Sequence, residues 1–334
     1  MHGTSHALSR AQCSSHAGAP LVLIERPIPV PGPGQVLLKV DACAICRTDL
    51  HVVDGDLAHP DRDIVPGHEI VGRVVSSGPD VAVPTGTRLG IPWLGWTCGE
   101  CEWCLRGQEN LCPDARFTGW QIDGGYADHV VADHRFCIPL PEELDAEHAA
   151  PLLCAGLIGW RALKAAGDGR TVGLYGFGAA AHLIAQVAIW QGRTVYAFTR
   201  EGNSRSQSFA MEVGAVFAGS SATPSPVALD AAIVFAPVGA LVPIALQSIK
   251  PGGTVVCAGI HMSQIPAFPY AHLWRERTLR SVANLTRADA QEFMALVPQM
   301  DLRISTEAIP LSGANEALSR LRRGDVDGAL VLVP

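Results

Sequence analysis

Two periodicities of apolar residues divide this chain into two kinds of region. Up to about residue 150, short β-branched runs are interrupted by Pro and Gly, as in L-V-L-I-E-R-P and V-P-G-P-G-Q-V-L-L-K-V. Such runs are typical of strands joined by turns. We expect strands over residues 36–40, 69–75 and 87–91, the first of them leading into a loop at Cys46. The first part of the chain is therefore predicted to be mostly β structure.

From residue 149 the pattern changes to alternating helices and strands. Apolar residues recur at helical spacing over 149–167, and T-V-G-L-Y-G-F-G-A-A-A-H-L-I-A then predicts a strand, a Gly-rich turn and a helix. Further strands are expected at 194–200, 231–235 and 254–258, with a helix at 241–249 between the last two. This alternation predicts a doubly wound parallel sheet.

The last part of the chain returns to amphipathic pieces. We expect a helix at 287–297, a strand near Ile304, a helix at 314–322 and a strand at 328–333. Because the parallel-sheet half is complete by Ala283, we assign these pieces to the β-rich domain. The 334 residues also exceed the roughly 250–300 residues at which single cores stop growing. The prediction is an α/β protein with a β-rich domain over 1–152 and 284–334 and a parallel-sheet domain over 153–283.

The composition of the chain limits which classes of protein and which kinds of ligand we expect. Hydrophobic residues make up 48% of the chain, yet no window reaches the roughly 18 uninterrupted apolar residues of a transmembrane helix. The N-terminal 18 residues lack the apolar core of a secretory signal, so we expect a cytoplasmic protein. The net charge is −7, and Lys and Arg are scattered, which argues against nucleic acid and anionic membranes as partners. Small molecules are the expected ligands.

One stretch concentrates groups that bind metal or move protons: C-R-T-D-L-H at 46–51, followed by G-H-E at 67–69. Zinc in catalytic sites takes three ligands such as thiolate and imidazole, and its fourth position stays open. We predict Cys46 and His68 as two of these ligands. The same stretch offers Thr48 as a proton-relay hydroxyl, Asp49 as a carboxylate that orients a ligand, and His51 as the terminal base.

Cys154 is our candidate for the third ligand of this site. It lies at the start of the helical pattern of 149–167, where the two predicted domains should meet. The alternative interpretation is a small buried residue in an apolar helix.

Four more cysteines lie close together in the β-rich half: Cys98, Cys101, Cys104 and Cys112. The cytosol keeps thiols reduced, so such spacings indicate metal ligation rather than disulfides. Four thiolates can surround one zinc ion tetrahedrally, which is the closed type of site that stabilises a fold. An iron–sulfur cluster accepts the same ligands and is the alternative. The polar, Gly-rich composition of this segment favours zinc.

A glycine-rich turn predicts dinucleotide binding in the second half. Gly176-Phe177-Gly178 follows a predicted strand and opens a helix at about Ala179. The two glycines let the backbone turn sharply and approach a pyrophosphate, which then rests on the helix N-terminus. Ala181 holds the third glycine position, where a methyl group still allows close packing on the strand. The strand, turn, helix and second strand together supply the context that this motif requires.

The end of the second strand bears on the choice of cofactor. An acid at this position accepts hydrogen bonds from the adenosine ribose and would repel a 2′-phosphate, whereas this chain has Thr199, whose hydroxyl is a candidate contact to the cofactor. Arg200 and Arg205 can hold a phosphate through charge-assisted bonds. If the strand ends two residues later, Glu201 takes the position of the acid and favours NAD. A further alternative is that Arg200 and Arg205 are solvated surface groups that bind no phosphate. We therefore predict NADP(H), with NAD(H) as the alternative.

These motifs together resemble the zinc-dependent medium-chain alcohol dehydrogenases, in the order that the family uses. They are C-R-T-D-L-H, P-G-H-E-I-V-G-R-V, the four-cysteine segment, P-L-L-C-A-G and Y-G-F-G-A-A-A. The resemblance implies a GroES-like β-rich catalytic domain with a Rossmann domain inserted. It also implies a dimer or tetramer. Two departures are that the N-terminal 18 residues lack the expected first strand, and that Thr199 replaces the acid of NAD-preferring members.

The resemblance also assigns roles to residues. It implies a catalytic zinc on Cys46, His68 and Cys154, and a structural zinc on the four clustered cysteines. It implies that Glu69 is the carboxylate beside the catalytic zinc and that Arg47 contacts the pyrophosphate. Trp93 matches the position that narrows the substrate pocket, although a core aromatic of the β domain fits equally well.

The resulting prediction is a zinc-dependent alcohol dehydrogenase that transfers hydride between an alcohol and NAD(P)+. A quinone or enone reductase on the same scaffold, using NADPH without zinc, is one alternative. A nucleotide-binding redox sensor that keeps zinc only for folding is another, although such a protein would not need Thr48 and His51. The sequence leaves open the substrate, the physiological direction and the oligomeric state.

Overall fold

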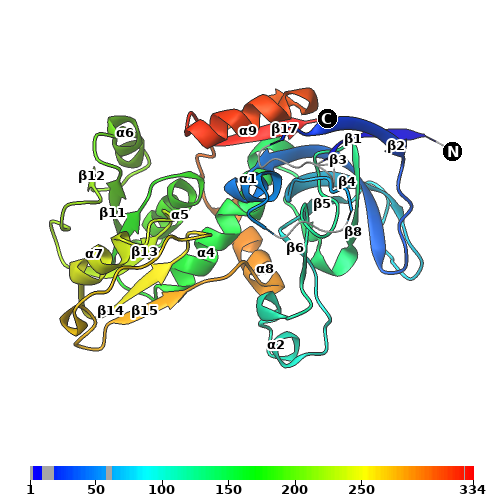
Figure 1. Ribbon diagram of the computed structural model, residues 1–334. Helices are drawn as coiled ribbons and strands as arrows, with labels where there is room; N and C mark the ends of the chain where they lie inside the picture. Colours follow the sequence, from blue (N-terminus) through cyan, green and yellow to red (C-terminus); the bar gives the residue numbers. More distant parts are fainter. Residues whose placement is uncertain (1–2, 10–18, 58–61, 327) are drawn as a thin grey trace. The chain divides into compact units, whose positions relative to one another are not determined.

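The computed structural model describes residues 3–9, 19–57, 62–326 and 328–334, which form two compact units (Figure 1). The first unit consists of Met1–Cys154, Asn284–Ala295 and Ile304–Pro334. The second consists of Ala155–Ala283 and Leu296–Arg303. Leu153 and Cys154 thus group with the first unit and 296–303 with the second, whereas our predicted division placed them the other way round.

A seven-stranded sheet is the framework of the first unit, in the order β16-β17-β3-β4-β5-β9 with β8 paired to β3. Its pairings are antiparallel except that of β16 with β17. Apolar side chains such as Leu38, Ile70 and Leu330 form its buried core, as a mostly β first half requires. The strands are Gln35–Ile45 (β3), Glu69–Ser77 (β4), Arg88–Ile91 (β5), His129–Asp133 (β8), Ile138–Pro139 (β9), Thr306–Pro310 (β16) and Ala329–Val333 (β17).

The N-terminal segment forms a strand where we expected none. β1 (Thr4–Ser9) pairs antiparallel with β2 (Val22–Pro27). The expectation was wrong because T-S-H-A-L-S is short and polar, and its strand rests on distant contacts: the pairing with β2 and the packing of Ala7 and Leu8 in the core. Residues 10–18 lie outside the described residues. A second small ribbon pairs β6 (Leu94–Trp96) with β7 (Arg116–Phe117).

A helix, rather than the expected loop, follows β3. In α1 (Arg47–Asp54) the Asp49 carboxylate accepts a hydrogen bond from the backbone N–H of Cys46, which caps the first turn. Gly55 ends the helix in the left-handed conformation, with φ of 81°. The other helices of this unit are α2 (Glu102–Leu105), α3 (Ala146–Ala149), α8 (Arg287–Leu296, whose last residue groups with the second unit) and α9 (Ala314–Arg323).

The second unit contains the predicted parallel sheet, in the order β12-β11-β10-β13-β14-β15. All five pairings are parallel, and the central strands β10 and β13 are almost fully buried, as expected when helices cover both faces. The prediction missed the four-residue strands β12 and β15. The strands are Thr171–Tyr175 (β10), Thr194–Thr199 (β11), Phe217–Ser220 (β12), Leu229–Val234 (β13), Ile249–Cys257 (β14) and Thr278–Ser281 (β15). The helices are α4 (Ala155–Ala165), α5 (Ala179–Trp190), α6 (Ser204–Glu212) and α7 (Leu241–Ser248).

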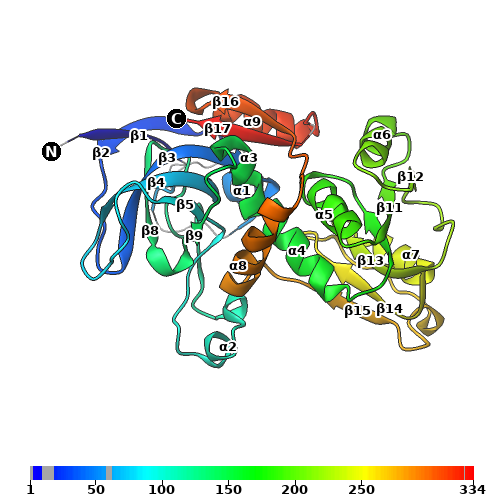
Figure 2. The same cartoon turned by 180° about the vertical axis from the view of Figure 1, so that it is seen from behind.

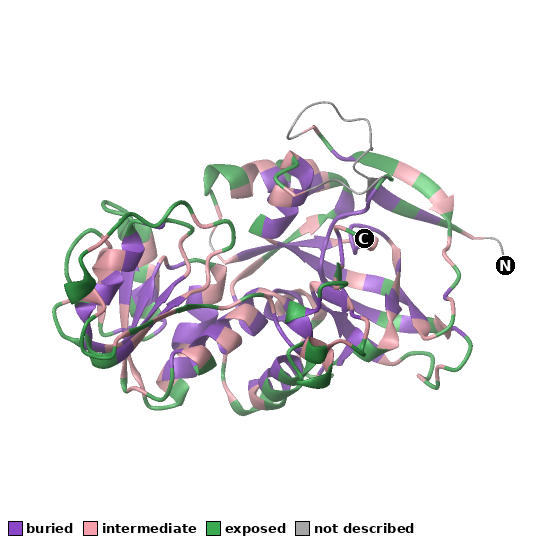
Figure 3. Cartoon of the chain, turned by 60° about the horizontal axis from the view of Figure 1, so that its bottom comes forward, coloured by how far each residue is buried: buried purple, intermediate pink, exposed green. Residues whose placement is uncertain are grey.

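The C-terminal part extends the first unit, as β16, β17 and α9 show (Figure 2). Leu296–Arg303 joins the second unit because the Gln186 side chain bonds both the backbone N–H and the carbonyl of Arg303. The inner strands of the two large sheets are mostly buried, whereas the edge strands β12, β15 and β16 have no buried residue. Many exposed residues lie on loops and outer helix faces (Figure 3). Among the described residues, no helix is both long and apolar enough to cross a membrane.

Candidate metal centres and nucleotide site

Four potential ligands converge in the first unit: Cys46, His68, Glu69 and Cys154, here called the Cys46 cluster. Their ligand atoms all lie within 4.8 Å of one another, and the two Sγ atoms are 3.8 Å apart. Cys46 lies between β3 and α1. His68 directly precedes β4, of which Glu69 is the first residue, and Cys154 follows a short 3₁₀ turn at Ala150–Leu153. The sheet and its neighbouring turns therefore bring together residues from three distant parts of the chain.

Asp49 holds two members of this cluster in place. Its Oδ1 is 2.9 Å from His68 Nδ1, and its Oδ2 accepts the Cys46 backbone N–H at 2.8 Å. Both Asp49 and His68 are fully buried. His68 Nε2 is also buried and, within the described part of the chain, has no hydrogen-bond partner. A metal-binding histidine commonly has a carboxylate at one imidazole nitrogen and its metal at the other. His68 has this arrangement, with two thiols beside the second nitrogen.

The ionisation of these groups fits a cation site. The Cys154 thiol and His68 lower the pKa of Cys46 well below its ordinary value, whereas Cys46 and burial raise that of Cys154 well above it. Burial and the Cys46 sulfur also raise the pKa of Glu69. The pKa values of the two thiols thus move in opposite directions because the two sulfurs are in contact. A divalent cation would bind these groups, because thiolate and imidazole are its preferred donors.

The predicted relay residues lie next to this cluster on α1. The buried Thr48 hydroxyl is 3.8 Å from Cys46 Sγ. His51 lies three residues further along, on the same helix face, and its side chain is 23% exposed. His51 Nδ1 is 2.7 Å from Asp56 Oδ2. Arg47, the first residue of this helix, is exposed.

An aromatic layer lies beside His68, and our sequence analysis found only one of its members. The Trp93 ring meets the His68 ring edge-on, with the centroids 4.8 Å apart. Phe117 and Trp120 stack with Trp93 and with each other at 5.2–6.1 Å. The aromatic pair in F-T-G-W, which begins five residues after the fourth clustered cysteine, was the sequence signal for these residues.

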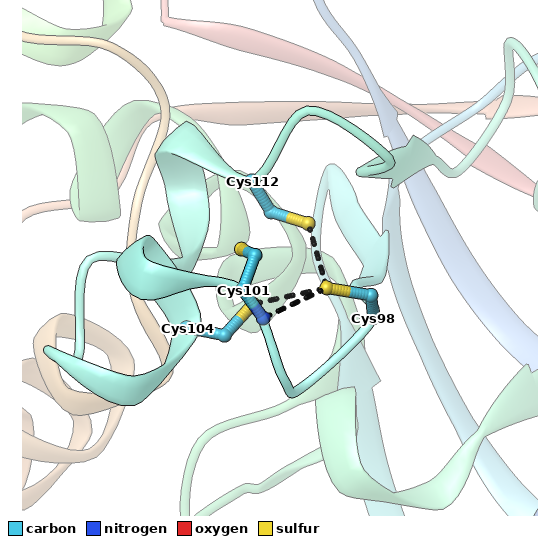
Figure 4. A group of neighbouring side chains, drawn as sticks. All are labelled: Cys98, Cys101, Cys104 and Cys112. Carbon is cyan, nitrogen blue, oxygen red and sulfur yellow. Dashed lines mark hydrogen bonds between the residues drawn. The ribbon is translucent and has the colours of Figure 1, made fainter.

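The other four cysteines gather in a small projection of the first unit, here called the cysteine lobe (residues 98–112; Figure 4). Cys98 Sγ is 3.9 Å from Cys104 Sγ and 3.6 Å from Cys112 Sγ, and the Cys101 N–H donates to it. Backbone N–H groups lower the pKa of Cys98 to about 7, and burial raises that of Cys112 to about 12. None of the nine described cysteines is in a disulfide. The lobe therefore offers four free thiols around one centre.

The lobe has little apolar packing of its own. No residue of α2 is buried. The lobe is fastened to α8 through Glu109, whose buried carboxylate accepts the backbone N–H of Arg287 at 2.9 Å and its Nε at 3.2 Å. Our sequence analysis did not single out Glu109. A fold with so few apolar contacts is of the kind that a bound metal stabilises.

The glycine turn of the second unit has the backbone that the motif requires. Gly176 follows β10 with φ of 90°, and a Cβ there would be only 2.8 Å from Ala236. Gly178 caps α5, which begins at Ala179. Phe177 and Ala181 are buried, and Ala181 is fully inaccessible. The N-terminus of a twelve-residue helix therefore opens directly after two glycines.

The end of β11 differs in detail from the prediction. The Thr199 hydroxyl is buried, donates to backbone carbonyls and accepts from Gln207 Nε2 at 3.1 Å. Arg200, Glu201 and Arg205 are exposed in the turn and the first residues of α6. The arginines rather than the threonine hydroxyl are therefore accessible to a ligand.

The chain is similar to known proteins over nearly its whole length. Residues 32–142 match the alcohol dehydrogenase GroES-like domain. Probable alcohol dehydrogenase AdhA of Mycobacterium tuberculosis is 44% identical over 94% of this chain and 93% of that protein. The structure of acetophenone reductase from Geotrichum candidum with NAD has a TM-score of 0.87 and 28% identity, over 99% of this chain and 97% of that one. A Sinorhizobium meliloti protein described as a zinc-binding dehydrogenase, bound to NADP, has a TM-score of 0.86 and 26% identity, over 99% and 100% of the two chains.

Proposed function

Because the chain belongs to the zinc-dependent medium-chain alcohol dehydrogenase family, we propose that it is an NAD(P)-dependent alcohol dehydrogenase. The reaction is a reversible hydride transfer between an alcohol and the nicotinamide, which gives an aldehyde or ketone. The observation that carries the proposal is the Cys46 cluster, where two thiols converge with an imidazole nitrogen that no described residue hydrogen-bonds. We assign the GroES-like catalytic domain to the first unit and the Rossmann domain to the second.

Two zinc ions per chain are part of this proposal. Cys46, His68 and Cys154 would hold the catalytic ion with Glu69 beside it, and Cys98, Cys101, Cys104 and Cys112 the structural one. When bound, the catalytic zinc supplies a Lewis acid that lowers the pKa of an alcohol hydroxyl. Asp49 would accept the proton of His68 Nδ1 and so fix the tautomer, which leaves the lone pair of Nε2 for the metal.

The proton released by the alcohol needs a route out of a buried site. The Thr48 hydroxyl next to Cys46 is the group placed to accept it first. His51, on the same face of α1 and partly exposed, then passes the proton to solvent. The Asp56 carboxylate at 2.7 Å orients the His51 ring.

NADP(H) is the cofactor that the accessible groups favour, with NAD(H) as the alternative. Gly176, Gly178 and the N-terminus of α5 would receive the pyrophosphate. The exposed Arg200 and Arg205 would receive the 2′-phosphate. Comparing kcat/KM for NADPH and NADH in the wild type and in Arg200→Ala tests this. A wild type that prefers NADH, or a variant that keeps its NADPH preference, contradicts the assignment.

A homodimer or homotetramer in the cytoplasm completes the proposal. In the described part of the chain β15 is an edge strand, the kind of element that pairs with another chain, and Tyr270 and Trp274 expose aromatic surface in the segment before it. A second copy of the chain is the partner that we assign to this edge. Sedimentation velocity of the wild type and of Trp274→Glu tests it, because a monomeric wild type would refute the assignment.

A panel of alcohols, aldehydes and ketones, assayed with both cofactors and accompanied by metal analysis, tests the function itself. We expect turnover of at least one alcohol–carbonyl pair and two zinc ions per chain. Reduction of quinones or enones by a protein without zinc would instead favour the reductase. Zinc in the lobe without turnover of any pair would favour a redox sensor.

A further inference from the structure

A short segment, Gly124–Gly125–Tyr126, runs along the chain that leads into His68. Three backbone hydrogen bonds join the two: Gly124 N–H to Val65 O at 2.7 Å, Tyr126 N–H to Pro66 O at 3.0 Å, and Gly125 N–H to Gly67 O at 3.0 Å. Neither this segment nor Tyr126 has a role in the function proposed above. The segment nevertheless determines where the backbone before His68 lies.

The contact between the two segments leaves no room for side chains at the glycines. A Cβ on Gly124 would overlap the Gly67 carbonyl, and a Cβ on Gly67 would overlap the Tyr126 ring. Gly67 also has φ of 97°, which disfavours any other residue. The Tyr126 ring therefore lies directly against the backbone of the residue before His68.

Tyr126 lies beside Asp49 as well. Its side chain is completely buried, and its hydroxyl makes no hydrogen bond of standard geometry within the described residues. Burial and the nearby Asp49 carboxylate raise the pKa of Tyr126 well above its ordinary value, so the group stays neutral. Asp49 is the carboxylate that bonds both His68 Nδ1 and the Cys46 N–H. The Tyr126 ring thus borders the backbone that leads into His68, and its hydroxyl lies near the carboxylate that bonds the imidazole.

We propose that Tyr126 is a positioning residue of the Cys46 cluster, and that its ring keeps the imidazole of His68 oriented for a metal. The ring rather than the hydroxyl supplies the contact with Gly67, because ring carbons are the atoms that a Cβ on Gly67 would overlap. A smaller side chain would leave space behind Gly67, into which the His68 backbone can relax. The geometry of the metal ligands would then loosen even though every ligand is still present. This inference rests on the proposed metal-binding function of the cluster.

The test measures zinc release to a chromogenic chelator by the intact protein. The kinetic phase that is missing from Cys46→Ser belongs to the Cys46 cluster. We expect Tyr126→Leu to accelerate this phase roughly ten- to a hundredfold, the usual effect of removing a group that orients a metal ligand. Tyr126→Phe should keep the slow release, since it retains the ring. The visible spectrum of the cobalt-substituted protein should change in Tyr126→Leu and not in Tyr126→Phe.

A matched control separates positioning from general loss of stability. Tyr175 is equally buried but lies in the second unit, against Phe198. Tyr175→Leu should lower the melting temperature without accelerating zinc release from the Cys46 cluster. If Tyr126→Leu fails to fold, Tyr126→Met is measured in the same way. Release as slow as in the wild type, or equal acceleration by Tyr175→Leu, overturns the inference. A wild type that binds zinc only in the lobe would instead overturn the proposed metal site itself.

Discussion

The two metal-ligand clusters of the first unit are built in opposite ways. The thiols of the cysteine lobe come from residues 98–112, within one short segment, and three of the four are partly exposed. The Cys46 cluster draws on residues 46–154, and its histidine and carboxylate are buried in the sheet region. One cluster is local and lightly packed, whereas the other depends on a folded domain.

This difference predicts what each metal contributes. Cys112 is the only apolar residue of the lobe that is buried, so we expect a metal there to supply folding free energy. The Cys46 cluster rests on an existing core and is surrounded by Thr48, Asp49 and His51, which have no counterpart in the lobe. Its metal is therefore expected to serve chemistry more than stability. Four substitutions test this division of roles.

Removing a ligand of the Cys46 cluster should have the largest effect on activity. Cys46→Ser should lower kcat/KM by roughly a thousandfold or more, because a Lewis acid contributes several kcal/mol and each 1.4 kcal/mol is about tenfold. The melting temperature should change little. Zinc content should fall from two ions to one. A wild type with only one zinc ion would contradict this distinction at once.

Removing a ligand of the lobe should mainly affect stability. Cys101→Ser should lower the free energy of unfolding by about 4 kcal/mol or more, as losses of structural metals do. Urea unfolding and limited proteolysis within residues 98–112 measure this effect. An unfolding midpoint equal to that of Cys46→Ser would show that the two sites do not differ in kind.

The third substitution asks whether the surroundings of the Cys46 cluster are catalytic. His51→Gln should slow turnover about ten- to a hundredfold below about pH 8, where hydroxide cannot replace the missing base. At higher pH the variant should approach the wild type. Steady-state rates across this range measure it. An unchanged pH–rate profile removes His51 from the proton route.

The smallest effect concerns how the lobe is attached. Glu109→Gln weakens the charged hydrogen bonds to Arg287 and should cost about 1–2 kcal/mol of stability, because the carboxylate is buried. Glu102→Gln is the matched control, since the Glu102–Arg106 pair in the same lobe is exposed and should contribute less than about 0.5 kcal/mol. If urea unfolding shows the same loss of stability for Glu109→Gln and Glu102→Gln, Glu109 does not fasten the lobe more strongly than an exposed ion pair does.

Local spacing was sufficient for several features of this protein. The alternation of strands and helices predicted the parallel sheet, because its central strands are buried on both faces and appear as continuous apolar runs. The clustered cysteines and Gly176-Phe177-Gly178 could be recognised because each motif lies within one short segment. Their structural consequences depend on neighbours in sequence.

Only the tertiary structure decided the features that rest on distant contacts. β1 forms because Ala7 and Leu8 pack into a core made by other strands, which its polar sequence does not reveal. Asp49 bridges Cys46 and His68 through one carboxylate, and Tyr126 reaches Gly67 across 59 positions of sequence (126 − 67). Such contacts arise when sheet pairing and burial bring separate segments together. A short window of sequence identifies the residues, but it does not determine which distant residues they contact.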